Sequence, residues 1–386
     1  MTADPTRVVV VGGSFAGLES AFLLRQKLGD RAAITLVSDR DEFLFKPNTI
    51  YIPFGGSEES LLIPLERPAR KREIDFVHGS FEELDRERRV VRAGGRELPY
   101  DYLVLATGAA MRPEEVPGLA EHAETIWNPA EMASLGRRLR TLLAESANGR
   151  PRTILFLVPP NNKCAGPLYE LVLMVDTWLR RRKARDGFRI VWTTYEPSYI
   201  AAFGPKLHTV VTEEFAERDV EGHVGWRVER VDEGVVRYEN GEERTYDLLV
   251  AFPPYVAAVR YPGLEADERG FLATEPGSRR VVGDDRIYAP GDAGDLPVKQ
   301  AFLAFLQADA VAEDIAARVE QRAPEFVFEP VSMCVMEELD KATFAQVPLR
   351  VTGDPDRPVE VLASANGAYR VGVSPVWRLG KKMLGL

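Results

Sequence analysis

The sequence is poor in cysteine and histidine and has no excess of positive charge. Of its 386 residues, 2 are cysteine and 4 are histidine, and the formal net charge is −10. Two cysteines do not make the disulfide framework of a small secreted domain, so a bridge between them would more plausibly be catalytic than structural. The acidic balance, without a basic cluster, argues against a nucleic-acid groove. No histidine lies in a recognised motif, and we expect no metal site.

Long hydrophobic runs are also missing. No apolar run approaches the ~20 residues that a membrane-spanning helix needs. The longest, "LLVAFPPYVAAV" (248–259), contains Pro253 and Pro254. The strand-like "RVVVVGG" begins at residue 7, which predicts that no secretory signal precedes it. With 45% hydrophobic and 28% charged residues, the composition is typical of a soluble globular chain with two or three domains.

Glycine is present where the first strand turns into a helix. The run "RVVVVGGSFAGLESAFLLRQKL" (7–28) predicts a buried strand, a turn containing Gly12 and Gly17, and a helix. Such glycines let the backbone approach a pyrophosphate at the helix N-terminus, although Ser14 replaces the middle glycine of the fingerprint. Asp39 follows the next strand, 22 residues after Gly17 (39 − 17), close to the ~20 expected for a ribose-binding carboxylate.

Two later strands end in turns of the same kind. "YDYLVLATGA" (100–109) ends in small residues, and "DDRIYAPGDAGD" (284–295) contains Asp292, whose carboxylate can accept hydrogen bonds from a ribityl chain. In this order, flanking an inserted segment, these turns look like the FAD domain of flavoproteins with two dinucleotide-binding domains.

The element pattern predicts an α/β chain with two Rossmann-like, doubly wound, three-layer domains of the dinucleotide-binding type, plus a C-terminal α+β segment. We expect a discontinuous FAD-binding domain at 1–111 and 247–318. Residues 112–246 would form a second Rossmann-like domain without a glycine-rich NAD loop. Residues 319–386 would form a C-terminal domain that holds the second cysteine.

The second candidate phosphate turn lacks the expected glycines. "VPPNNKCAGPLYEL" (158–171) has no glycine before Gly166 and contains Cys164. The next strand, "IVWTTYEP" (190–197), offers only Glu196 as a weak ribose ligand. We interpret this domain as one that keeps the architecture but no longer binds a pyrophosphate. Its reductant should then be small enough to reach a thiol.

Four segments resemble the sulfide:quinone oxidoreductases and the flavoprotein subunit of flavocytochrome c sulfide dehydrogenases. They are "SDRDEFLFKP" (38–47), "NKCAGPLYE" (162–170), "VKQAFLAFLQADAVAEDI" (298–315) and "SMCVMEELDKATF" (332–344). The resemblance extends from residue 7 to at least 344, in the family's order.

The resemblance implies a redox-active disulfide between Cys164 and Cys334 beside the flavin. Hydrosulfide would attack one sulfur by thiol–disulfide exchange, and electrons would leave through FAD to a quinone. Glu170 is the expected acid or base. Lys299, near the start of a helix, would stabilise negative charge on the flavin. No cysteine remains for covalent attachment, so we expect FAD to be bound non-covalently.

The expected FAD contacts come from these turns and from the matching segments. They are Gly12, Ser14, Phe15, Ala16, Gly17, Ser38, Asp39, Lys46, Pro47, Phe81, Ala106, Thr107, Gly108, Gly291, Asp292, Lys299 and Gln300.

Other functions stay open at this point. Taken separately, either cysteine could be an ordinary core residue. The chain could be a soluble sulfide dehydrogenase that reduces a cytochrome, an NADH:quinone oxidoreductase, or a non-catalytic flavin and thiol redox sensor.

The C-terminal "PVWRLGKKMLGL" (375–386) mixes aromatic, aliphatic and cationic residues. This mixture is typical of an interfacial membrane anchor, and its basic charge would suit anionic headgroups. The alternative is a tail that docks on the protein's own surface. We expect a peripheral membrane protein, cytoplasmic if soluble, and leave a homo-oligomer open.

Overall fold

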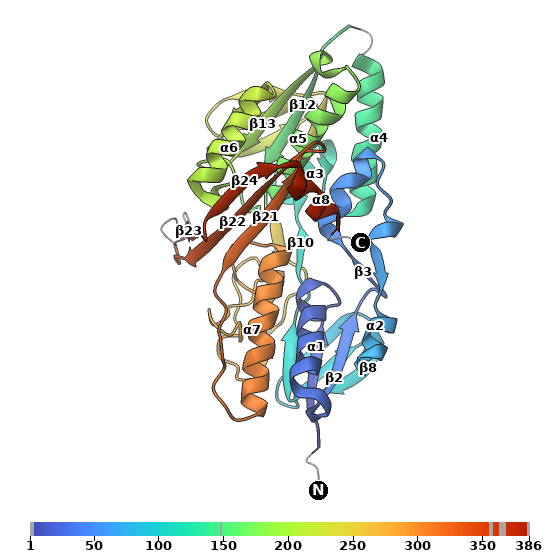
Figure 1. Cartoon of the computed structure of the whole chain (residues 1–386), viewed down its shortest axis with the longest axis vertical. Coiled ribbons are helices and arrows are strands. Elements are labelled where there is room, and N and C mark those ends of the chain that lie inside the picture. The colour runs from blue at the N-terminus through green and yellow to red at the C-terminus, as the bar shows by residue number, and fades with distance from the viewer. Residues whose placement is uncertain (1–3, 147–148, 355–357, 363–367, 384–386) are drawn as a thin grey trace. The chain divides into compact units, whose positions relative to one another are not determined.

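The computed structural model describes residues 4–146, 149–354, 358–362 and 368–383, and the chain divides into two compact units. The first unit comprises Met1–Leu44, Leu62–Ala110 and Val256–Pro330, and the second comprises Phe45–Leu61, Met111–Tyr255 and Val331–Leu386. Each contains a parallel sheet with helices (Figure 1), so the predicted α/β class is confirmed. By their contacts, the C-terminal strands group with the second sheet. The predicted division into three domains stays a prediction.

The first unit has a five-stranded parallel sheet in the order β20-β9-β1-β2-β5. Its strands are β1 (Thr6–Val11), β2 (Ala32–Ser38), β5 (Asp75–His78), β9 (Tyr102–Leu105) and β20 (Ile287–Tyr288). A run of four valines, Val8–Val11, is buried on both faces of β1, as a parallel sheet between two layers requires.

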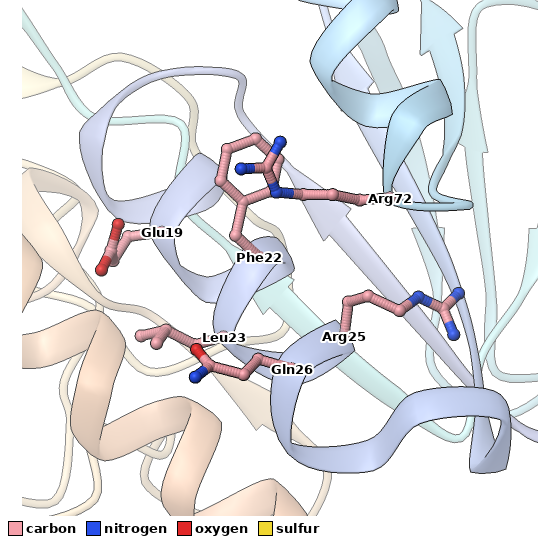
Figure 2. Close-up of a pocket in the computed structure, with 6 residues that line it drawn as sticks. All are labelled: Glu19, Phe22, Leu23, Arg25, Gln26 and Arg72. Atoms are coloured by element: carbon pink, nitrogen blue, oxygen red, sulfur yellow. The ribbon is translucent and has the colours of Figure 1, made fainter.

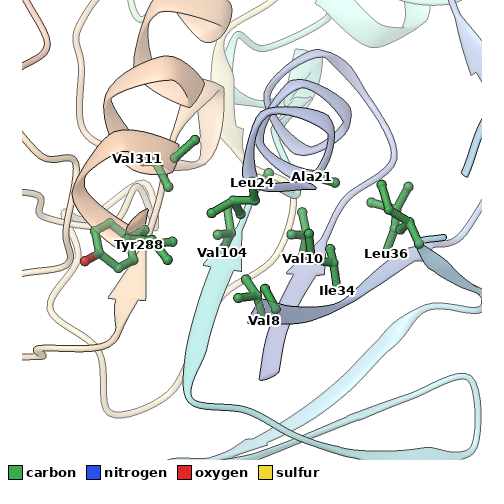
Figure 3. Close-up of a cluster of buried hydrophobic side chains, with 14 of the residues drawn as sticks. Val8, Val10, Ala21, Leu24, Ile34, Leu36, Val104, Tyr288 and Val311 are labelled. Atoms are coloured by element: carbon green, nitrogen blue, oxygen red, sulfur yellow. The ribbon is translucent and has the colours of Figure 1, made fainter. Parts of the chain in front are cut away.

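Helices cover one face of this sheet. They are α1 (Phe15–Leu28) and α7 (Ala301–Val319), which pack against each other. Figure 3 shows Leu24 of α1 and Val311 of α7 above the sheet residues Val10 and Val104, and all four are fully buried. Burying one such side chain contributes about 1.5–3 kcal/mol, so this seam holds α1 and α7 against the sheet.

An antiparallel layer covers the opposite face. It consists of β6 (Phe81–Asp85), β7 (Val90–Ala93) and β8 (Arg96–Pro99). Val91 and Leu98 pack there against Val9 and Leu103 of the sheet, which completes three layers.

The second unit has another five-stranded parallel sheet, in the order β11-β18-β12-β13-β14. Its strands are β11 (Glu124–Thr125), β12 (Arg152–Val158), β13 (Phe188–Thr194), β14 (Val220–His223) and β18 (Leu248–Ala251), and its helices include α4 (Pro129–Ser146), α5 (Gly166–Arg181) and α6 (Gly204–Glu217). Helix α5 is buried on every side over 168–179, including the charged residues Glu170 and Asp176, so these side chains need partners inside the unit.

Antiparallel C-terminal strands explain why α5 has no exposed face. They are β21 (Val331–Glu337), β22 (Ala342–Val351), β23 (Val359–Val361) and β24 (Arg370–Ser374), followed by α8 (Pro375–Met383). Strand β21 packs against α5 (Figure 1). This packing brings the segment of Cys334 to the helix that follows Cys164.

Shorter elements complete the two units. They are β3 (Glu42–Leu44), β4 (Leu62–Pro64), α2 (Glu66–Lys71), β10 (Ala109–Met111), α3 (Leu119–His122), β15 (Val228–Asp232), β16 (Val235–Tyr238), β17 (Glu243–Thr245) and β19 (Tyr255–Ala257). Among the residues described above, no helix has both the length and the apolar character needed to cross a bilayer.

Candidate cofactor turns and thiol site

Backbone contacts that only glycine permits close the first turn of the first unit. Gly12 has φ +121°, and a side chain there would overlap the carbonyl oxygen of Ala106. A side chain on Gly17 would overlap the carbonyl oxygen of Gly12. The turn therefore packs backbone against backbone at the ends of β1 and β9, and its amides can closely approach a pyrophosphate.

Ser14, the departure from the fingerprint, is the N-cap residue of α1. Its carbonyl oxygen accepts a hydrogen bond from the Leu18 amide at 2.9 Å, but its side chain makes no capping hydrogen bond. Ser14 thus lies at the helix N-terminus, where its predicted contact with FAD would be made, and that contact stays a prediction. The adjacent Phe15 ring packs edge-to-face on Phe43 and Phe305, with centroids 4.9 and 5.6 Å away.

The third turn meets the first at the start of α1. Gly291 has φ +72°, and a side chain there would come within 2.8 Å of the Ala16 Cβ. Its amide donates to Gln307 Oε1 at 3.2 Å. Gln307, which the sequence analysis missed, is buried on α7 and also accepts a hydrogen bond from Arg279 Nε at 3.1 Å. Asp292 follows Gly291 in this turn, so the predicted ribityl ligand belongs to the same group.

Predicted contacts at the neighbouring strand ends also lie in this unit. Thr107 Oγ1 and the Tyr261 hydroxyl are 2.9 Å apart, and the Phe81 ring packs on Tyr261 with centroids 4.8 Å apart. Ser38 ends β2 and accepts a hydrogen bond from the Arg40 amide at 3.1 Å. Asp39 follows it and is exposed, as a ribose ligand has to be. Gly108, at the end of the Thr107 turn, has φ +75°.

Lys299 is buried just before α7. Its ammonium donates to the Gly294 carbonyl oxygen and lies 4.0 Å from the centroid of the Phe271 ring. Gln300 is the N-cap residue of α7, and its carbonyl oxygen accepts a hydrogen bond from the Ala304 amide at 2.9 Å. The predicted cation therefore lies at a helix N-terminus, where both charges favour an anion.

Two predicted FAD contacts, Lys46 and Pro47, belong to the second unit. They begin the 3₁₀-helix η2 (Lys46–Phe54), where the Lys46 ammonium lies 2.8 Å from the centroid of the Trp127 ring. Their role toward FAD stays a prediction. The turns of the first unit nevertheless fit the cofactor, with glycines for the pyrophosphate, a carboxylate for each sugar chain and a cation for the flavin.

An open pocket of about 360 Å³ beside α1 contains none of these residues. Figure 2 shows the six residues that line it: Glu19, Phe22, Leu23, Arg25, Gln26 and Arg72. The Arg72 guanidinium lies 4.2 Å from the centroid of the Phe22 ring. This surface feature is a cation–π contact without convergent polar groups, and we assign no role to it.

A side chain closes the second candidate phosphate turn, which follows β12. Asn162 Nδ2 donates to the carbonyl oxygens of Phe252 at 2.9 Å and Pro253 at 3.2 Å, just beyond the end of β18. Its Oδ1 accepts a hydrogen bond from the Cys164 amide at 3.0 Å. Dinucleotides bind at the carboxyl ends of strands in open α/β sheets. Here the buried Asn162 side chain joins two of those strand ends.

Glu196, the weak ribose ligand predicted from the sequence, forms hydrogen bonds within its own unit. Glu196 accepts hydrogen bonds from the Ala201 amide at 3.0 Å, from Thr194 Oγ1 at 3.0 Å and from the Tyr169 hydroxyl at 3.2 Å. Burial raises the pKa of Glu196 to about 7. Because its carboxylate is occupied by these donors, it is poorly placed to hold a sugar.

The two cysteines come together in the second unit. Cys164 lies just before α5 and Cys334 lies on β21, and both are half-buried. The Cys334 sulfur is 3.8 Å from the point that a Cβ on Gly166 would occupy, so it lies beside the first turn of α5. Burial is the main cause that raises the pKa of Cys334, and the negative charge of Glu170 is the next largest. Cys164 raises it further. The structure thus brings together two thiols that are 170 residues apart (334 − 164).

Glu170 lies next to the thiols on the buried side of α5. Burial raises the pKa of Glu170 to about 7, even though Lys381 of α8 forms an ion pair with it. The Lys381 ammonium also donates to the carbonyl oxygen of Val335, the residue after Cys334, at 2.8 Å. A carboxyl group with a pKa near neutrality can both take and give a proton at physiological pH.

A second carboxylate, Glu337, lies at the end of β21. It accepts hydrogen bonds from Arg378 Nε at 2.7 Å, from the Tyr51 hydroxyl at 2.6 Å and from the Leu339 amide at 2.7 Å. This buried group therefore fixes α8 to β21 and to η2 within the second unit.

The C-terminal segment is oriented differently from the prediction. The expectation that its cations face headgroups is wrong for Arg378 and Lys381, because both neutralise buried carboxylates. Val376 and Leu379 face outward instead, and they are 70% and 61% exposed. Trp377 stacks on Phe344 with ring centroids 4.7 Å apart. The last predicted anchor residues, Leu384 and Leu386, lie outside the described residues.

Comparison with known proteins agrees with this geometry. Residues 6–140 match the pyridine nucleotide-disulphide oxidoreductase family. The chain is 28% identical to a sulfide-quinone reductase of Aquifex aeolicus, over 71% of this chain and 63% of the relative. It is 24% identical to the mitochondrial sulfide:quinone oxidoreductase of Dictyostelium discoideum, over 78% of this chain and 68% of the relative.

A solved structure extends the similarity to nearly the whole chain. The sulfide:quinone oxidoreductase of Aquifex aeolicus superposes with a TM-score of 0.83 and 22% identity, over 98% of this chain and 90% of that chain. The chain is thus similar in sequence to the sulfide:quinone oxidoreductases and shares the fold of the Aquifex structure.

A second group of relatives is named for NADH oxidation. The external alternative NADH-ubiquinone oxidoreductase of Yarrowia lipolytica is 24% identical, over 76% of this chain and 56% of the relative. A type II NADH:quinone oxidoreductase of Staphylococcus epidermidis is 28% identical, over 39% of this chain and 38% of the relative. The Aquifex sequence alignment also spans less than two thirds of its relative's length, at 63%. Substrate and acceptor therefore have to be argued from the chain's own residues.

Sequence reasoning missed three residues of the thiol site. In the sequence, Asn162 stands only in a turn that lacks the expected glycines, nothing singles out Glu337, and Lys381 lies in the segment interpreted as a membrane anchor. Asn162 carried a usable signal, because a polar residue replaced a phosphate-binding glycine there. Lys381 carried none, because 211 residues separate it from its partner Glu170.

Proposed function

We propose that this chain oxidises sulfide through Cys164 and Cys334 and passes the electrons through FAD to a quinone. The observation that carries the proposal is the pairing of two thiols beside a carboxyl group, in the turn where a second Rossmann-type domain would bind its dinucleotide. The names of the Aquifex and Dictyostelium relatives support the same substrate and acceptor.

The chemistry uses the oxidised form of the pair. Hydrosulfide attacks one cysteine sulfur, a new sulfur–sulfur bond forms there, and the bond between the cysteines breaks. One cysteine then holds a persulfide, and the other leaves with the electron pair as a thiolate. Bound FAD supplies the two-electron acceptor that this dithiol chemistry needs. Glu170, whose pKa is about 7, takes up the proton that sulfide releases.

The second turn argues against NADH as the reductant. Asn162 joins the strand ends where the pyrophosphate would lie, and Glu196 is bonded to donors of its own unit. Both features favour a small reductant.

The assignment of a quinone as the electron acceptor rests on the relatives' names and on the exposed apolar residues of α8. Val376 and Leu379 would insert into the membrane interface, so we propose peripheral attachment without a cationic contribution from Arg378 or Lys381. A cytochrome acceptor would not require this face.

Anaerobic absorbance of the purified flavoprotein tests the proposal. Sulfide should bleach the flavin and NADH should not, and a quinone supplied in lipid vesicles should restore the colour. Cys164→Ser and Cys334→Ser should each slow bleaching by about 10⁴-fold or more, as for other residues that act as a covalent unit. Met333→Leu, beside Cys334 on β21, serves as the control and should bleach normally.

Each alternative predicts a different outcome of the same experiment. Bleaching by NADH alone would overturn the sulfide assignment. Bleaching by neither donor would favour a redox sensor. Reoxidation of the flavin by a cytochrome but by no quinone would overturn the proposal that the electron acceptor is a quinone.

A further inference from the structure

The ammonium of Lys381 is buried between two parts of the thiol site. The side chain is 9% exposed and donates to Glu170 Oε2 and to the Val335 carbonyl oxygen. Val335 is bonded to Cys334 along β21, so the cation lies within one residue of a reacting sulfur. The contact comes from α8, the element that follows the last strand.

Stability alone is a weak explanation for this contact. Taking a lysine and a glutamate out of water costs several kcal/mol per ion, which their attraction often fails to offset. A second lysine of the same unit, Lys341, can be compared with Lys381. It pairs with Glu214, but its side chain remains 26% exposed. Lys381 is therefore the more costly of the two lysines to bury, and its second bond places it beside Cys334.

We infer that Lys381 is a positioning residue, whose two hydrogen bonds, to Glu170 and to the Val335 carbonyl oxygen, fix the Glu170 carboxyl group beside Cys334. The inference rests on the proposed function in one respect, namely that Glu170 serves the thiol pair. Lys381 itself acts only through Glu170.

The charges around Glu170 give the direction of the effect. Burial raises the pKa of Glu170, and the Lys381 charge is the largest influence that lowers it, which leaves the value at about 7. The negative charge of Glu337 raises it slightly, and the Glu337 amide lowers it by a hydrogen bond. The same neighbourhood also contains Cys334 on β21 with Cys164 near it, Tyr51 on η2 and Arg378 on α8. Without Lys381, Glu170 should hold its proton to a higher pH.

Infrared titration of the full-length flavoprotein tests this directly. The band of the protonated Glu170 carboxyl is assigned by its loss in Glu170→Gln, and its midpoint is followed against pH. Lys381→Met should raise the midpoint by about one pH unit or more, a tenfold change in the ratio of ionised to protonated forms. Lys381→Arg, which keeps the charge, should restore the original midpoint.

A matched control separates this role from simple stabilisation. Lys341→Met removes the Lys341–Glu214 ion pair of the same unit, so it should lower the melting temperature without moving the Glu170 midpoint. If Lys381→Met does not fold, Lys381→Gln keeps a donor for the Val335 carbonyl without the charge. A midpoint unchanged in the charge-free variant would overturn the inference.

The measurement uses neither sulfide nor quinone. Failure of sulfide to bleach the flavin would overturn the proposed function while the midpoint shift remained. A fixed midpoint in a chain that oxidises sulfide would overturn only the role of Lys381.

Discussion

Two turns at equivalent places in two parallel sheets are closed in different ways. The turn after β1 packs backbone on backbone, because Gly12 and Gly17 have no side chains to separate the strands and the helix. The turn after β12 is closed by the side chain of Asn162, which bonds to two carbonyls beyond β18 and to the Cys164 amide. The first arrangement leaves amides for a phosphate, and the second uses the same space for protein hydrogen bonds.

This difference shows how a Rossmann-type domain can change its use without changing its fold. The sheet and the crossing helix need only buried apolar residues, which both units supply. The phosphate site needs bare backbone at one turn. In the second unit the Asn162 side chain occupies that turn, and Cys164 follows two residues later.

The largest effect should come from adding a methyl group to the first turn. Gly12→Ala places a Cβ against the Ala106 carbonyl oxygen at φ +121°, so the turn has to open. We expect loss of FAD and destabilisation by at least about 2 kcal/mol, measured by flavin content and thermal unfolding.

A second glycine of the first unit provides the control for this variant. Gly95 has φ +70° and no atom near its would-be Cβ, so Gly95→Ala should cost only about 1 kcal/mol and keep FAD. Equal flavin content in the two variants would contradict the role assigned to the first turn.

The second turn can be broken by removing its side chain. Asn162→Gly leaves the buried carbonyls of Phe252 and Pro253 without their donor, which should cost about 2–4 kcal/mol in the free energy of unfolding. Asn161→Gly is the matched control, because Asn161 has φ +64° and glycine relieves that strain. We expect NADH to bleach neither variant. Bleaching of Asn162→Gly by NADH would mean that this one side chain had excluded the dinucleotide.

The smallest effect should come from Glu196→Gln. Glutamine can accept from the Ala201 amide and donate to the hydroxyls of Thr194 and Tyr169, so stability at pH 5 should change by less than about 1 kcal/mol. Because burial raises the folded pKa of Glu196 to about 7, its contribution is full below pH ~4.5 and is lost as the pH rises through 7. The original chain should therefore lose stability relative to the variant between pH 5 and 8 in denaturant titrations. Weaker sulfide oxidation in this variant would contradict a purely structural Glu196.

The sequence predicted the local parts of this molecule well. Valine-rich strands, glycine turns and apolar helices encode their own backbone geometry within short segments, so the α/β class and the turn after β1 could be expected from residues such as Val10 and Gly12. The neighbourhood of Cys164 and Cys334 was expected only from a family resemblance, since no local rule relates segments that far apart.

The tertiary structure alone decided what surrounds the thiols. Packing of β21 and α8 on α5 determines that Lys381 meets Glu170, and that Arg378 turns inward while Leu379 faces outward. An amphipathic helix has an apolar and a charged face, and the sequence of the helix alone does not tell which face is buried. Here the buried carboxylates that the helix packs against determine it. Buried Glu170 and Glu337 each need a cation, and this need outweighs the exposure of a few apolar side chains.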